Sequence, residues 1–166
     1  YIQKAHHAYL VGSTGYGEEN EKVFQNQRFG HARYTWMCFT RLGVEAFSQI
    51  ESDEFKLLNL RQLNGGGVRV VLSESKYLLL AMGMGGMSDY ERVSGGDDLI
   101  GRGTSYLSLS SEGSKMKSVL VGYYQPSFSD LSDYRILAQG SVEFPLVEKF
   151  SWVNLLSYAY DTAPPE

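Results

Sequence analysis

The segment from Tyr134 to Phe144 alternates between two kinds of side chain along its whole length. Its even-numbered positions are apolar or small, whereas its odd-numbered positions, from Arg135 to Glu143, are mostly polar. Because successive side chains of a β-strand point to opposite sides, this period of two predicts a strand between an apolar and a polar medium. Two kinds of β-barrel are built from such strands. In a soluble barrel the apolar face points inward, and in an outer-membrane barrel the apolar face points toward lipid.

Similar segments recur along the chain and predict nine strands joined by short polar connections. The expected strands cover residues 4–16, 22–34, 38–50, 55–72, 77–87, 99–110, 115–125, 134–144 and 149–161, and the longest expected loop covers residues 88–98. Gly65 to Gly67 interrupts the fourth strand, where it indicates a bend or bulge. The spacing is typical of an antiparallel up-and-down meander, so we expect an all-β fold that forms a single barrel domain over residues 1–166.

The two ends of this meander differ in their connections. Those near residues 17–22, 51–54, 88–98, 126–133 and 161–166 fall at one end, are generally longer, and contain most of the acidic residues. Outer-membrane barrels have short periplasmic turns and longer outer loops. The asymmetry therefore favours a transmembrane barrel with its acidic end facing outside.

Composition argues against several other classes of protein. The net charge of −4 is unlike that of a general nucleic-acid binder. Cys38 is the only cysteine, so no intrachain disulfide can form. No apolar run approaches the ~20 residues of a transmembrane helix, which does not count against a barrel because barrel strands are only half apolar.

The three histidines, His6, His7 and His31, are the first residues to consider for catalysis. His6 and His7 are adjacent, so a strand points them to opposite sides, and no Ser-His-Asp arrangement can be placed by spacing alone. The acidic segment 89–98 lacks the regular ligand spacing of a calcium loop. We therefore expect no enzymatic activity, no cofactor and no metal site.

The alternation also assigns side chains to the two faces of the barrel wall. The residues expected to line the lumen are Arg41, Glu45, Arg61, Arg69, Arg102, Arg135, Gln139 and Glu143. The residues expected to face lipid are Val44, Leu58, Leu60, Val70, Leu80, Met82, Ile136 and Val142.

Several short stretches carry a resemblance to a known family. They are residues 47–51, 53–55, 58–61, 65–67, 131–135 and 160–166, the last reading Tyr-Asp-Thr-Ala-Pro-Pro-Glu. From about Arg33 onward the chain resembles the salt-induced outer-membrane protein family, catalogued as domain of unknown function 481. The resemblance implies a barrel in the bacterial outer membrane, and it carries no established catalytic or ligand-binding residues.

The resemblance also bears on the number of strands. Sequences of this family usually continue past the Pro-Pro-Glu stretch into one more strand and have more strand-like sequence on the N-terminal side. We therefore expect that residues 1–166 lack N-terminal strands and the C-terminal closing strand of a barrel of about twelve strands, an even number as in other bacterial barrels.

Three hypotheses about function follow. The first is a non-enzymatic outer-membrane barrel, either a structural or anchoring component of the envelope or a narrow pore. Its partners would be outer-membrane lipids and another envelope protein, with no nucleic acid. The alternatives are a soluble lipocalin-like barrel that binds a small apolar ligand, and an outer-membrane barrel hydrolase. Arginines outnumber glutamates among the lumen candidates, so an open pore would favour anions, but charge pairing within a confined lumen favours occlusion.

Overall fold

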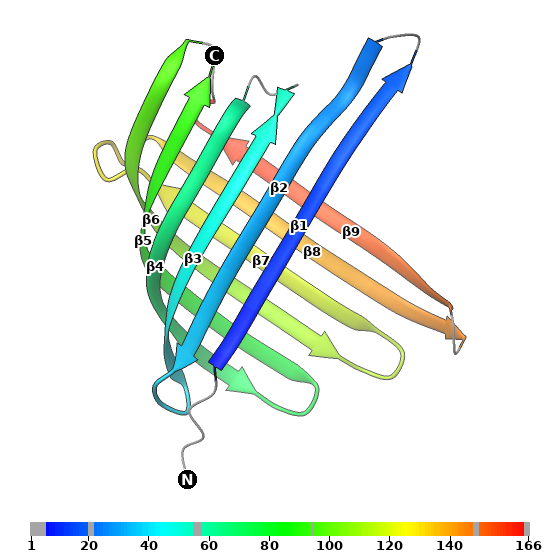
Figure 1. Cartoon of the computed structure of the whole chain (residues 1–166). Coiled ribbons are helices and arrows are strands. Elements are labelled where there is room, and N and C mark those ends of the chain that lie inside the picture. The colour runs from blue at the N-terminus through cyan, green and yellow to red at the C-terminus, as the bar shows by residue number, and fades with distance from the viewer. Residues whose placement is uncertain (1–5, 20–21, 55–57, 94, 148–149, 165–166) are drawn as a thin grey trace.

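The computed structural model describes residues 6–19, 22–54, 58–93, 95–147 and 150–164. In this part of the chain, nine strands form one antiparallel sheet in which each strand pairs with its neighbours in sequence (Figure 1). The strands are β1 (His6–Glu19), β2 (Lys22–Met37), β3 (Leu42–Asp53), β4 (Leu58–Glu74), β5 (Leu78–Val93), β6 (Gly96–Glu112), β7 (Lys117–Pro126), β8 (Tyr134–Val147) and β9 (Phe150–Asp161). The all-β fold and the up-and-down order expected from the sequence are confirmed.

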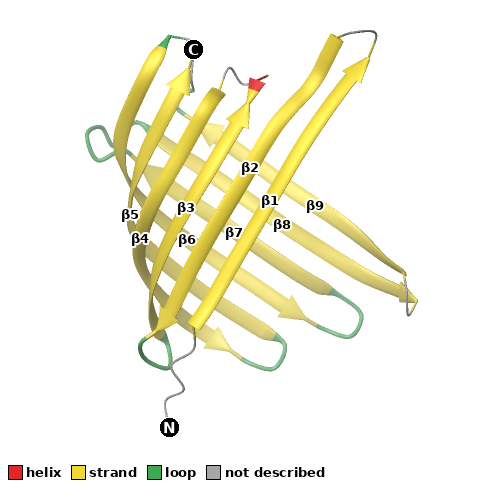
Figure 2. Ribbon diagram, viewed as in Figure 1, coloured by secondary structure: helices red, strands yellow, loops and turns green. Residues whose placement is uncertain are grey.

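The sheet curls into a half-barrel, with β1 to β4 in front of β7 to β9 in the view of Figure 2. The curl gives the sheet a concave side, called here the interior, and a convex side, called the outer side. No helix of the described residues is long and apolar enough to cross a membrane.

Several connections differ from the sequence-based expectation because the strands run further than expected. The expected loop over residues 88–98 is instead a hairpin, in which β5 continues to Val93 and β6 starts at Gly96. The turn expected at residues 35–37 lies at residues 38–41, because β2 continues to Met37. The connection from β7 to β8, residues 127–133, remains a loop. The acidic end is therefore built largely from strand extensions, which place some of its acids inside the half-barrel.

The three consecutive glycines Gly65 to Gly67 do not form a bulge. Their pairing with β5 is unbroken, and the register shifts of β4 against β5 lie instead between Leu58 and Leu60 and between Val71 and Ser73. A Cβ atom at Gly67 would lie 2.2 Å from the backbone oxygen of Met84. The glycines thus allow the close approach of β4 and β5 where these strands bow around one side of the molecule (Figure 1).

A second glycine contact fixes an aromatic ring in the interior. Gly83 on β5 is directly opposite Tyr106 on β6, and a Cβ atom at Gly83 would lie 2.3 Å from the tyrosine ring. The ring therefore covers Gly83, as aromatic side chains do over a glycine on a neighbouring strand. This contact directs the hydroxyl of Tyr106 toward the middle of the interior.

Candidate functional site

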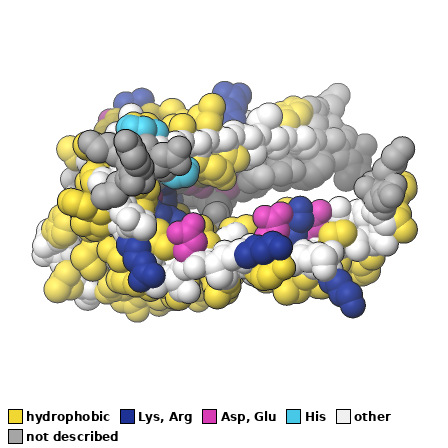
Figure 3. Space-filling view, turned by 90° about the horizontal axis from the view of Figure 1, so that it is seen from below, with side chains coloured by type: hydrophobic (Ala, Val, Ile, Leu, Met, Phe, Trp, Pro, Cys, Tyr) yellow, Lys and Arg dark blue, Asp and Glu magenta, His cyan; other side chains and the backbone are white. Residues whose placement is uncertain are grey.

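The interior contains two groups of charged side chains, one above the other along the half-barrel. The lower group, called here the Glu45 layer, consists of Arg33, Thr35, Glu45, Arg69, Tyr106 and Tyr123. The upper group, called here the Asp89 layer, consists of Arg61, Asp89, Glu91, Arg102, Asp133, Arg135 and Asp161. Figure 3 shows the interior from below, with charged side chains along a hollow between the two sides of the sheet.

Glu45 on β3 is the acceptor at the centre of its layer. The hydroxyl of Thr35 donates a hydrogen bond to one carboxylate oxygen over 2.9 Å, and the hydroxyl of Tyr106 donates to the other over 2.5 Å. Tyr106 in turn accepts a hydrogen bond of 2.8 Å from Arg69. These contacts connect β2, β3, β4 and β6 through side chains alone.

Arg33 extends the Glu45 layer across the interior. Its guanidinium donates a hydrogen bond of 3.3 Å to the hydroxyl of Tyr123, although β2 and β7 are five strands apart in the sheet. It also lies 5.1 Å from the ring centroid of Tyr106 and 5.5 Å from that of Phe47, within the range of a cation–π interaction. The Glu45 layer thus lines the wall of the half-barrel and also connects β2 to β7 across the interior.

Asp89 on β5 is the centre of the upper layer, and its side chain is fully buried. It accepts a hydrogen bond of 3.0 Å from Arg102 on β6 and another from Arg135 on β8. Both arginines are almost fully buried as well. Buried charges require partners of opposite charge, and here each arginine holds at least two carboxylates.

The remaining carboxylates complete the pairing of these arginines. Arg102 binds Asp133 through two parallel hydrogen bonds of 3.0 Å, a bidentate geometry that attaches the 127–133 loop to β6. Arg135 donates to Asp161 over 2.6 Å and also to Glu91, which accepts a further bond of 2.8 Å from Arg61. The Asp89 layer therefore ties β4, β5, β6, β8 and β9 together.

The loop that Asp133 anchors has its own internal hydrogen bonds. Asp130 accepts bonds from the hydroxyl and the backbone N–H of Ser132 over 2.7 and 2.9 Å. These bonds, chiefly that of the hydroxyl, lower the pKa of the Asp130 carboxyl below its usual value. A carboxyl with a lowered pKa contributes stability at neutral pH and loses it as the pH falls through that pKa, so acid should loosen this loop.

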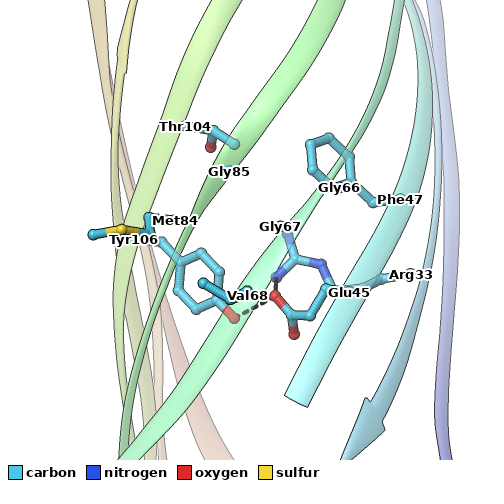
Figure 4. A pocket seen from close by; sticks show the side chains of 10 residues that line it. All are labelled: Arg33, Glu45, Phe47, Gly66, Gly67, Val68, Met84, Gly85, Thr104 and Tyr106. Atoms are coloured by element: carbon cyan, nitrogen blue, oxygen red, sulfur yellow. Dashed lines mark hydrogen bonds and ion pairs between the residues drawn. The ribbon is translucent and has the colours of Figure 1, made fainter. Parts of the chain in front are cut away.

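A small pocket lies beside the Glu45 layer (Figure 4). Arg33, Glu45, Phe47, Thr104 and Tyr106 line it, and glycines of β4 and β5 form a wall without side chains. It lies on the interior side of the sheet, between the Glu45 layer and the bowed part of β4 and β5.

Comparison with models of protein families assigns the chain to a family. A model described as "Protein of unknown function, DUF481" matches residues 1–166. The chain belongs to the DUF481 family. No curated protein and no solved structure matches it.

Most of the residues expected to line the lumen lie in the interior of this DUF481 chain. Five of them are members of the two layers: Glu45, Arg61, Arg69, Arg102 and Arg135. Gln139 and Glu143 share the interior side of β8 with Arg135 but belong to neither layer, and Gln139 is exposed. The expectation for Arg41 is wrong: it lies in the 38–41 turn before β3 and its side chain is exposed.

The residues expected to face lipid lie on the outer side of the DUF481 sheet, with one exception. Val44 and Ile136 are 42% and 38% exposed, and Leu60, Val70, Leu80, Met82 and Val142 are half-buried among their neighbours. Leu58 is only 1% exposed, so its assignment to the lipid face is wrong. The β-bulge between Leu58 and Leu60 breaks the alternation, so Leu58 faces the interior opposite Val93.

The sequence reasoning missed all four carboxylates of the Asp89 layer, namely Asp89, Glu91, Asp133 and Asp161. It assigned all four to the connections at the acidic end. The alternation of Met87, Asp89 and Glu91 with the intervening residues was the available signal for Asp89, since it continues the pattern of β5 into the expected loop.

Within the described ranges of this DUF481 chain, no group of three or more histidine, cysteine, aspartate or glutamate side chains could hold a metal ion. His31 lies 3.1 Å from the amide oxygen of Gln49 and next to the rings of Phe29 and Phe47. The aromatic rings of these neighbours pack against the imidazole of His31.

Proposed function

We propose that this DUF481 chain forms the wall of an outer-membrane β-barrel that has no enzymatic activity and acts as a structural or anchoring component of the envelope. The observation that carries the proposal is the reversed distribution of polarity in the sheet. Apolar side chains are exposed on the outer side, whereas arginines and carboxylates are buried on the interior side. A soluble barrel has the opposite arrangement.

The outer side provides a suitable surface for lipid. Several neighbouring strands contribute large aliphatic side chains that are between 38% and 56% exposed: Val44, Val68, Met84, Leu107, Leu120 and Ile136. Such a broad apolar surface is rare on soluble proteins and is the usual sign of contact with a membrane or another protein. Outer-membrane lipid is the partner that covers all of these strands at once.

Aromatic side chains lie on the outer side near both ends of the strands. Trp36 and Trp152 lie toward the short turns, and Tyr124, Tyr134 and Tyr160 lie toward the acidic end. The three tyrosines follow one another across β7, β8 and β9, with ring centroids 5.6 and 6.1 Å apart. Two aromatic girdles of this kind mark the membrane–water interfaces of outer-membrane barrels.

The two charged layers support a closed scaffold more than a wide pore. Side chains in the Glu45 layer connect β2 to β7, and those in the Asp89 layer connect β5 to β8. Both connections cross the space that a diffusing solute would use. We therefore propose that solutes do not pass freely. The acidic end is the part of the chain that we propose another envelope protein contacts, because most of the acidic residues lie there.

The two alternatives receive less support. A soluble lipocalin-like barrel would bury Val44 and Ile136 in a closed core, but both are exposed on the outer side. A barrel hydrolase would need a nucleophile and a carboxylate beside a histidine, and the contacts of His31 do not supply them.

Cell fractionation tests the proposal. The full-length protein should sediment with the outer membrane, remain there after washing with urea or alkaline carbonate, and need detergent for extraction. It should also migrate faster on gels before heating than after, as a folded barrel does. Recovery as a soluble periplasmic or cytoplasmic protein would contradict the proposal.

A further inference from the structure

The pocket beside the Glu45 layer has a chemical character that a structural role does not explain. Its bare wall is formed by Gly67 and Gly85, where a Cβ atom would lie 2.2 or 2.1 Å from a backbone oxygen of the neighbouring strand. Side chains cannot be accommodated at these positions, so the space in front of them stays open. Figure 4 shows the guanidinium of Arg33 and the rings of Phe47 and Tyr106 around this space.

The Glu45 layer beside the pocket contains more positive than negative side chains. The guanidiniums of Arg33 and Arg69 lie 3.9 and 3.7 Å from the carboxylate of Glu45. Glu45 already accepts hydrogen bonds from Thr35 and Tyr106. One carboxylate thus faces two guanidiniums, and the layer has one positive charge in excess.

Arg33 also has an unused donor. Its Nε atom is buried and has no hydrogen-bond partner among the described residues. The aromatic rings of Tyr106 and Phe47 hold the guanidinium in place, and its outer nitrogens already point to Glu45 and Tyr123. A buried donor on a charged group that lacks an acceptor is costly, so this site favours a ligand that accepts a hydrogen bond.

The size of the pocket limits that ligand. It has room for about one water-sized particle, so it would enclose a single small ion but not a sugar, a nucleotide or the organic body of a carboxylate. A water molecule would accept the hydrogen bond but leave the excess charge in place. We propose that the pocket binds a single small anion of the size of chloride, held by the Arg33 side chain, while Arg69 offsets the charge of the Glu45 carboxylate that also lines the pocket. This binding does not depend on whether the outer side contacts lipid.

Bromide provides a direct test because it replaces chloride and scatters anomalously. Crystals of the full-length protein grown in sodium bromide should show an anomalous difference peak in the pocket, within contact distance of Arg33 Nε. A crystal without that peak, with only water density in the pocket, would overturn the proposal.

A solution experiment tests the same site without crystals. We would measure the thermal unfolding midpoint in detergent, in sodium chloride and in sodium gluconate at equal ionic strength, because gluconate is too large for the pocket. Chloride should raise the midpoint of the wild-type protein in a saturable way, since a ligand that binds only the folded state stabilises it.

Two variants test whether the effect of chloride on the unfolding midpoint arises at Arg33. Arg33→Gln should lose most of the difference between chloride and gluconate, whereas Arg92→Gln should keep it, because Arg92 is exposed on the outer hairpin and bonds to Asp97 and Tyr90. Equal midpoints of the wild-type protein in the two salts would contradict the proposal, even if Arg33→Gln fails to fold. An unchanged chloride effect in a folded Arg33→Gln variant would contradict it as well.

Discussion

The carboxylate of Asp89 on β5 binds the guanidinium of Arg135 on β8, three strands away in the sheet and across the interior. Backbone hydrogen bonds in this sheet join only neighbouring strands, so this side-chain contact is one of those that hold the curl itself. Because Arg102 binds the same carboxylate oxygen from β6, the loss of one carboxylate affects two arginines at once.

Asp89→Asn should therefore destabilise the protein strongly. Removing one partner of a buried ion pair typically costs about 3–5 kcal/mol, because the remaining charge stays buried without compensation. The measurement is the free energy of unfolding by denaturant in detergent. Asp97→Asn is the matched control, since Asp97 pairs with Arg92 at the exposed tip of the β5–β6 hairpin, and it should have little effect. Equal destabilisation by the two variants would argue against the Asp89 layer as a structural centre.

The contact between Gly83 and Tyr106 provides a second stability test. Gly83→Ala would place a methyl group 2.3 Å from the ring of Tyr106, so the ring or the backbone must shift. Overpacking of this kind costs about 1–3 kcal/mol. Gly122→Ala is the control, because a Cβ atom there would lie 3.9 Å from its nearest neighbour, an ordinary contact. The same denaturation assay compares the two variants, and a Gly83→Ala protein as stable as Gly122→Ala would refute the close packing.

The assignment of the two sides can be tested with neighbouring residues of β8. Val142 lies on the outer side and Ser141 on the interior side. An arginine that faces lipid costs about 2–4 kcal/mol at the middle of a bilayer and about 0–1 kcal/mol near its interfaces, and Val142 lies between the middle and the Phe144–Trp152 pair. Val142→Arg should therefore lower the yield of heat-modifiable, membrane-inserted protein more than Ser141→Arg. Similar yields for the two variants would mean that the outer side does not contact lipid.

The sequence predicted the features of the fold that depend on the alternation of apolar and polar residues. The prediction was wrong where a bulge or an unexpected strand extension changes that alternation. The order of the strands and the interior position of Arg102 and Arg135 follow from a period of two that continues without interruption. Leu58 was assigned to the wrong side because a bulge inserts one residue, and a bulge has no clear pattern in a single sequence. Asp89 was missed because a polar stretch resembles a loop, even when its strand continues.

Contacts between strands that are not neighbours in the sheet could not be predicted from the sequence pattern. Arg33 and Tyr123 are ninety positions apart, and only the curl of the sheet brings them together. The same holds for Asp133, which reaches Arg102 because the 127–133 loop runs beside β6. The sequence therefore predicted Glu45 and most of the interior arginines, but not the residues to which they bind.

The charged layers also predict the behaviour of the protein in planar bilayers. Because side chains cross the interior at two levels, the full-length protein should give no large steady current at neutral pH. Disruption of the Glu45 layer by Tyr106→Ala should increase the conductance, since this removes a ring that contacts Arg33 and the hydroxyl that bonds to Glu45. Large, anion-selective currents from the wild-type protein would show a pore and would contradict the closed scaffold.

The proposal that the outer side contacts lipid is tested most directly by tryptophan fluorescence. Trp36 and Trp152 are the only tryptophans, and both lie on the outer side toward the short turns. In vesicles of phospholipids brominated at defined depths along the acyl chain, bromine near the headgroup should quench this emission most strongly, as expected for an aromatic girdle at the interface. Emission that is unaffected by bromine at every depth would contradict membrane insertion and, with it, the proposed function.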